Sequence, residues 1–135
     1  MIRVQNLHKT FGHQPVLRGL TLDVATGEIM VVIGRSGGGK SVLLRHLIGL
    51  LHPDSGAIMV DGTDITGLRG SALDRIRERY GVVFQGGALF DSMSVFENVA
   101  FPLQEKSRLA AAEISQRVEE KLEQVGLSGM GHKNP

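Results

Sequence analysis

Apolar residues follow two strand-like patterns along the chain. Residues 2–7 and 20–24 alternate apolar and polar positions, which predicts strands buried on one face. The run IMVVI (29–33) is apolar throughout, and GVVF (81–84) is nearly so. Continuous apolar runs of this length are typical of strands buried on both faces, as in a parallel sheet. We therefore expect a β region at the start of the chain and two further buried strands after it.

Helical spacing appears in three other segments. Residues 40–51 carry apolar side chains at positions 43, 44, 47, 48 and 51, which predicts an amphipathic helix directly after a glycine-rich loop. Residues 73–80 suit a short amphipathic helix, and residues 114–125 suit a longer one. Gly126 follows the longer segment and is placed to cap its C-terminus.

The chain becomes mostly helical after Gln85 and the Gly86-Gly87 pair. The stretch Ser94-Val-Phe-Glu97 is a capping-box pattern that should open a helix, and Pro102 is expected to end it. We therefore divide the chain into an α/β core over residues 1–85 and a partial helical region over residues 86–135.

The loop between the first buried strand and the first helix carries the chemistry. Its sequence, GRSGGGKS (34–41), matches G-x-x-x-x-G-K-[ST], the phosphate-binding loop. Glycines let consecutive backbone N–H groups converge on an anion, and the following helix directs its free N-terminal amides at it. Lys40 is expected to reach the β- and γ-phosphates, and Ser41 to bind Mg²⁺. The predicted nucleotide-binding residues of this segment are Gly34, Arg35, Ser36, Gly37, Gly38, Gly39, Lys40, Ser41 and Val42.

Composition excludes several other classes of site. The formal net charge is +1, which gives no basic surface for nucleic acid. The chain has no cysteine, so disulfides and thiolate metal sites are excluded, and a reducing compartment is favoured. No apolar run approaches the roughly 18 residues of a membrane helix, and MIRVQNLHKTFG lacks the apolar region of a signal peptide.

Hydrolysis needs a further group that helps hold Mg²⁺ or orients the attacking water, and two residues are candidates. Asp61 follows the short apolar run AIMV (57–60), as an acidic metal ligand would. However, Asp61-Gly62 is also a strong hairpin-turn pair, and we favour the turn. Gln85 follows GVVF and precedes two glycines. From the residues alone, it is equally well read as a catalytic group or as a plain strand end.

Taken together, GRSGGGKS and YGVVFQ (80–85) resemble the ATP-binding subunit of an ABC transporter. The resemblance covers the whole chain and implies the α/β fold of a P-loop NTPase, binding ATP and Mg²⁺. In the family, Phe11 matches the aromatic residue that stacks on adenine, and Val16 matches an apolar contact to the base. Gln85 matches the Q-loop glutamine, which contacts Mg²⁺ or the lytic water, so Lys40 and Gln85 are the implied catalytic residues. Val42 replaces a hydroxyl residue found in many members.

The resemblance also implies partners and a location. The stretches GKSVLLRHLIGLLHPDSG and VFQGGALFDSMSVFENVAFPL are most similar to Mla/MCE-type ATPases, which implies transport of phospholipid or a related lipid. A membrane permease is expected to contact residues 86–105, and a second ATPase subunit to complete the transporter. The subunit would then be cytoplasmic and peripheral on the inner face of the cell membrane.

The resemblance further implies that catalytic parts lie beyond Pro135. The family's signature loop, Walker B carboxylates, D-loop and switch histidine have no counterpart in these residues. LSGMG (127–131) lies too early to be the signature and is better read as a glycine-rich helix exit. We therefore expect the N-terminal half of an ATPase that binds nucleotide without hydrolysing it alone. Alternatives are an ABC ATPase for another substrate, a non-catalytic nucleotide-binding fragment and, less favoured, a small-molecule P-loop kinase.

Overall fold

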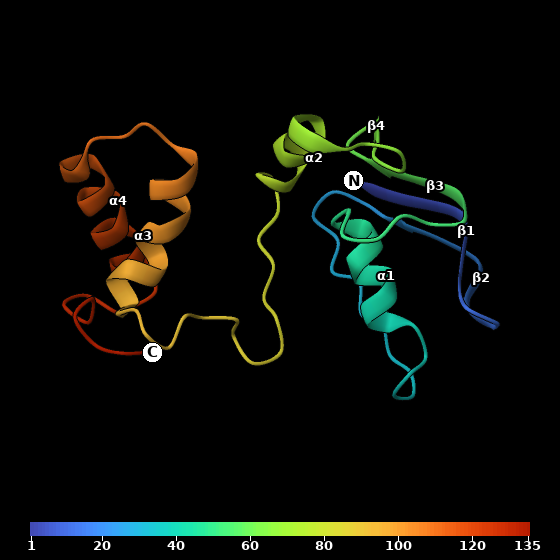
Figure 1. The fold of residues 1–135 in the computed structure, drawn as a ribbon, viewed down its shortest axis with the longest axis horizontal. Helices are drawn as coiled ribbons and strands as arrows, with labels where there is room; N and C mark the ends of the chain where they lie inside the picture. Colours follow the sequence, from blue (N-terminus) through green and yellow to red (C-terminus); the bar gives the residue numbers. More distant parts are fainter. The chain divides into compact units, whose positions relative to one another are not determined.

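A computed structural model describes residues 1–135 and divides them into two compact units, Met1–Gly81 and Val82–Pro135 (Figure 1). The first unit holds all the strands and two helices, and the second holds two helices. No helix is both long enough and apolar enough to cross a membrane. The functional division proposed at residues 85 and 86 stays a prediction.

The first unit is built on a four-stranded antiparallel sheet. Its strands lie in the order β2-β1-β3-β4, so β1 is central and pairs with two neighbours. The predicted alternation is confirmed in β1, where Val4 and Leu7 are buried. The strand bounds are β1 Ile2–Phe11, β2 Gln14–Val24, β3 Ser55–Val60 and β4 Thr63–Asp64.

The turn interpretation of Asp61 is confirmed. Asp61 and Gly62 connect β3 to β4, with Val60 paired to Thr63 across the turn. Both turn residues have positive φ, 45° and 80°, as a two-residue hairpin with the mirror-image turn requires. The Asp61 carboxylate also forms ion pairs with the N-terminal amine and with Arg79, so it links this turn to two residues outside the hairpin.

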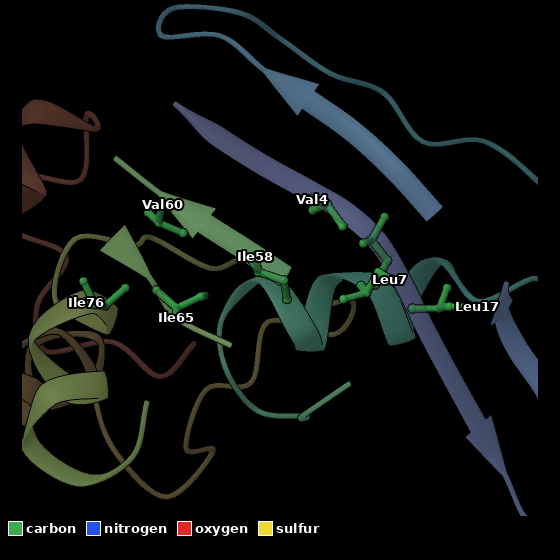
Figure 2. Close-up of a cluster of buried hydrophobic side chains, with 8 residues drawn as sticks. Val4, Leu7, Leu17, Ile58, Val60, Ile65 and Ile76 are labelled. Atoms are coloured by element: carbon green, nitrogen blue, oxygen red, sulfur yellow. The ribbon is translucent and has the colours of Figure 1, made fainter. Parts of the chain in front are cut away.

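One apolar core fills the space between the sheet and two helices, α1 (Lys40–Leu47) and α2 (Gly70–Arg77). Figure 2 shows Leu7 and Leu17 on the side of this cluster where α1 lies. Leu43 from α1 and Ile76 from α2 complete it, so each helix is held by its apolar face. The buried members are Val4, Leu7, Leu17, Leu43, Ile58, Val60, Ile65 and Ile76.

The prediction of two strands from the continuous apolar runs is wrong. Residues 29–33 and 81–84 have no strand geometry, and Ile29 and Val83 are 90% and 94% exposed. An apolar run becomes a strand only where another strand hydrogen-bonds to it. Neither segment has a partner among the four paired strands of the structure. The apolar composition of the two segments predicts burial, but both are exposed, because composition alone does not supply a neighbouring strand.

The second unit is a helical pair with its own small core. Helix α3 (Val95–Lys106) packs on α4 (Ala111–Gln124), and Ala100 and Val118 are fully buried between them. The prediction that Pro102 ends a helix is wrong, because α3 continues through it. A proline inside a helix removes one N–H donor and crowds the carbonyl four residues before it, and the apolar residues of α3 that pack on α4 offset this cost.

Two helix-end predictions are confirmed. Ser94 caps α3 by accepting from the Glu97 N–H, while the Glu97 carboxylate accepts from the Ser94 N–H at 2.7 Å. At the end of α4, Gly126 has a φ of 74° and donates to Glu123, while the Leu127 N–H donates to Leu122. This pair of bonds is the Schellman arrangement that a glycine at this position permits.

The residues after α4 also behave as a helix exit. The carbonyls of Gly131 and Lys133 accept hydrogen bonds from the Phe96 and Val95 N–H groups, both at 2.8 Å. Segment 127–133 therefore closes the start of α3, which agrees with a structural interpretation of LSGMG.

The capping box makes the stability of the first turn of α3 depend on pH. Hydrogen bonds from the Ser94 N–H and hydroxyl hold the pKa of Glu97 below its ordinary value of 4.5. A carboxyl with a lowered folded pKa stabilises the fold above its unfolded pKa, and this stabilisation is lost as the pH falls through the folded value.

Glu97→Gln should therefore speed amide hydrogen exchange in the first turn of α3 at pH 7 and flatten its acid dependence below about pH 4.5. Glu105→Gln, in the same helix but outside the cap, is the matched control and should exchange like the wild type. Equal protection in all three proteins would show that the carboxylate does not stabilise the helix end.

Candidate functional site

The candidate site is the loop that leads into helix α1. Residues 36–39 form a turn, and the helix begins at Lys40 with Gly39 as its N-cap residue. Gly39 has a φ of 88°, and no side chain caps the helix, so its first amides stay free of side-chain partners. Free amides at a helix start are the groups that bind an anion.

Gly39 is needed for space as well as for its backbone conformation. A Cβ atom at this position would lie 3.1 Å from Cγ1 of Val16 and 3.3 Å from Cδ2 of Leu17. Strand β2 therefore lies directly against the start of the helix. The structure brings together two predicted site residues that are far apart in the sequence, Gly39 and Val16, while the contact of Val16 with a base stays a prediction.

The Lys40 side chain bonds back to the start of the loop. Its Nζ donates hydrogen bonds to the carbonyls of Gly34 and Arg35, at 2.7 and 2.8 Å. The Gly38 N–H donates to Arg35 at 3.1 Å, which tightens the same turn. The ammonium group is thus already inside the curve of the loop, where an anion would be bound.

The remaining loop residues leave room for a ligand. A Cβ atom at Gly34 or at Gly37 would meet no other atom within 4 Å, so the backbone there is open to contact. Ser36 and Ser41 are exposed. Val42 is different, because its side chain packs against the core of the first unit. The donor set of this loop, amides with the Lys40 ammonium and two accessible hydroxyls, fits a nucleotide phosphate with Mg²⁺.

Phe11 ends β1, where it pairs with Gln14 of β2. Its ring is 45% exposed, so a flat apolar partner can reach it. Lys9 Nζ lies over the same ring, 5.6 Å from its centre. The role of Phe11 in stacking on a base stays a prediction.

Gln85 belongs to the second unit. It is exposed, and it starts a turn closed by the hydrogen bond from the Gly87 N–H to the Phe84 carbonyl at 3.0 Å. Gly86 and Gly87 both have positive φ, which explains why glycines follow it. The predicted catalytic role of Gln85 remains a prediction.

Sequence reasoning missed the structural role of Asn98. Its Nδ2 donates to the carbonyls of Phe90, Met93 and Ser94 at 3.0–3.1 Å, and its Oδ1 accepts from the Phe90 N–H at 2.8 Å. One side chain of α3 therefore holds the loop before the helix. No motif in the sequence indicates this role, because the partners of Asn98 are backbone groups.

His46 also gains a definite role. It is 1% exposed, and its Nδ1 lies 2.7 Å from the Val42 carbonyl within α1. His46 is therefore a packing residue of the first unit.

Comparison with known families gives one family match, to the ABC transporter family over residues 17–135. Among curated proteins, the chain is 48% identical to a probable ribonucleotide transport ATP-binding protein, mkl, of Mycobacterium leprae, over 99% of this chain and 39% of that protein. It is 44% identical to the methionine import ATP-binding protein MetN of Rhizobium etli, over 100% of this chain and 37% of that protein. The chain thus spans about two fifths of these relatives.

Solved structures give the same result. The structure is similar to the ATP-binding cassette MJ0796 in a dimeric, post-hydrolysis state bound to ADP and Pi, with a TM-score of 0.84, 29% identity and coverage of 100% of this chain and 62% of that one. It is also similar to cbiO1 of Clostridium perfringens, part of the transporter complex cbiONQ, with a TM-score of 0.83, 30% identity and coverage of 98% and 53%. The predicted fold class, the N-terminal half of an α/β ATP-binding cassette, is confirmed.

The contact between Gly39 and Val16 can be tested by substitution. Gly39→Ala combines a positive φ with contacts of 3.1 and 3.3 Å, so it should lower the free energy of unfolding of the first unit by about 1–3 kcal/mol. Gly34→Ala in the same loop meets no neighbour and should change stability far less. Urea unfolding followed by circular dichroism measures both, and equal losses would contradict this packing.

Proposed function

Because the chain belongs to the ABC transporter family, we propose that its residues form the nucleotide-binding part of a transporter ATPase subunit. The observation that carries this proposal is the loop 34–41, with its free amides at the start of α1 and the Lys40 ammonium held inside it. The loop binds the phosphates of ATP, and Phe11 and Val16 bind its base.

Lys40 changes partners when nucleotide binds. Its bonds to the Gly34 and Arg35 carbonyls are between a charge and neutral groups. Phosphate oxygens carry negative charge, which attracts the ammonium group more strongly than neutral carbonyls do, so the ammonium transfers to the β- and γ-phosphates. The backbone amides of residues 39–41 and the positive end of α1 supply the remaining attraction.

Mg²⁺ neutralises the phosphate charge when it is bound, and Ser41 is the residue placed to hold it through its hydroxyl. Gln85 would complete this shell or orient the attacking water, as the family resemblance implies. The same resemblance places the signature loop and the Walker B carboxylates outside residues 1–135. We therefore propose that these residues alone bind ATP and hydrolyse it no faster than background.

Lys40→Ala should weaken ATP binding at least tenfold, because it removes the one cation inside the loop. Lys106→Ala, an exposed lysine in the last turn of α3, is the control and should bind like the wild type. Titration with a fluorescent ATP analogue measures both. Unchanged affinity in Lys40→Ala would remove the loop from the binding site.

We also propose that residues 86–105 contact a membrane permease, and that a second ATPase subunit completes the transporter. This places the subunit on the cytoplasmic face of the membrane as a peripheral protein. Two observations support the contact. Leu89 and Phe90 are exposed apolar residues, and Asn98 holds their loop on α3 through four hydrogen bonds. A fixed apolar loop is suited to docking on a partner.

A photo-crosslinker at Phe90, which is exposed, should link to the permease in the assembled transporter. The same group at Arg117, on the exposed side of α4, should not. Crosslinks from Arg117 alone, or from neither position, would show that the permease binds elsewhere.

The transported substrate is the least constrained part of the function. The names of the relatives mention ribonucleotide transport and methionine import, and neither mentions a lipid. The lipid assignment expected from the sequence therefore has no support from them. We therefore propose that the transported substrate is a nucleotide or an amino acid, as the names of these relatives suggest. We also propose that the permease selects this substrate.

A further inference from the structure

We propose that Lys9 and Asp54 form a clamp that positions Phe11 for stacking on the adenine base, so that both are positioning residues of the nucleotide site. This inference rests on the proposed function and deepens it, because it concerns recognition of the base rather than of the phosphates. The motif residues of the loop do not include either side chain.

The clamp consists of four hydrogen bonds between the end of β1 and the segment before β3. Lys9 Nζ donates to Asp54 Oδ1 at 2.8 Å and to the His52 carbonyl at 2.9 Å. Asp54 Oδ2 accepts from the Thr10 N–H at 2.7 Å, and the Asp54 N–H donates to the His8 carbonyl at 2.9 Å. Asp54 thus holds the two residues that immediately precede Phe11.

The end of β1 needs such support. Pairing between β1 and β3 stops at His8 and Ser55, so residues 9–11 have a strand neighbour only on the β2 side. On that side Thr10 is paired with Pro15, which has no N–H to donate. The register also shifts between Lys9 and Thr10. The Asp54 carboxylate takes the place of the missing strand at the point where Phe11 is presented.

Lys9 contacts the Phe11 ring directly. Residues two apart on a strand lie on the same face, and Lys9 Nζ is 5.6 Å from the ring centre. The Lys9 side chain is only 18% exposed, so its ion pair and its contact with the ring are partly shielded from water. Shielding strengthens both interactions relative to those of a fully exposed lysine.

The Asp54 carboxyl is ionised at neutral pH. The hydrogen bond from Lys9 and then the one from the Thr10 N–H hold the pKa of Asp54 below its ordinary value of 3.8. A carboxyl of this kind keeps its stabilising bonds above its unfolded pKa and loses them only as the pH falls through the lower folded value. The clamp is therefore fully formed under physiological conditions.

The clamp also connects the two halves of the nucleotide site. Asp54 lies on the segment that leads from α1 to β3, and α1 begins at the phosphate loop. Gly56 keeps this segment close to β1, since a Cβ atom there would lie 2.4 Å from the Asn6 carbonyl oxygen. The segment that follows α1 is therefore hydrogen-bonded to the end of β1, so the base-binding residue and the phosphate-binding helix are held in the same unit.

The absence of tryptophan from the chain allows a direct test. Phe11→Trp introduces a single tryptophan at the stacking position, and ATP should quench its fluorescence while inorganic tripolyphosphate should not. In this background, Lys9→Met and Asp54→Asn should bind ATP roughly three- to tenfold more weakly, with tripolyphosphate affinity unchanged. Lys9→Arg keeps the charge and the ring contact and should restore ATP binding.

Asp23→Asn is the matched control, because it breaks the exposed Arg3–Asp23 pair, which joins the other end of β1 to β2. It should leave both affinities unchanged. Equal losses for ATP and tripolyphosphate in Lys9→Met and Asp54→Asn, or no loss for either, would overturn the clamp while leaving nucleotide binding in place. If the parent protein bound neither ligand, the proposed function itself would fail, and the clamp with it.

Discussion

The site depends on the packing of helix α1 against the hairpin of β1 and β2. Leu43 from the helix is buried in one cluster with Leu7 of β1 and Leu17 of β2. Burying a leucine side chain contributes about 1.5–3 kcal/mol, and this packing directs the start of the helix at the loop. The amides at the start of α1 can then stay free of side-chain partners, because packing on the sheet holds this end of the helix in place. Gly39 allows this arrangement, since β2 leaves no room for a side chain there.

The sequence predicted local features well wherever nearby residues determine them. The turn at Asp61-Gly62, the capping box at Ser94 and the glycine exit of α4 each rest on bonds between residues a few places apart. Residues 29–33 and 81–84 were predicted wrongly because a buried strand depends on a neighbour that its own sequence does not specify. Pro102 failed as a stop signal because packing on α4 outweighs the loss of one donor.

The residues of the candidate site also differ in how far the sequence could predict them. The loop 34–41 was recognisable because glycines, lysine and serine at fixed spacing describe a phosphate site within eight consecutive residues. Lys9 and Asp54 were not recognisable, since they are 45 residues apart and meet only when β1 and β3 pair. Asn98 escaped notice for a related reason, because its partners are backbone carbonyls that any sequence would supply. Residues that bind a ligand therefore show in the pattern, and residues that position them show only in the fold.

The central claim is that the loop binds a nucleotide through Lys40 while the end of β1 binds its base. An experimental structure of the protein with ATP and Mg²⁺ tests both parts at once. The account predicts that Lys40 Nζ leaves the Gly34 and Arg35 carbonyls for the phosphates, and that adenine lies on the Phe11 ring. A nucleotide bound elsewhere, or bound with Lys40 still on those two carbonyls, would contradict it.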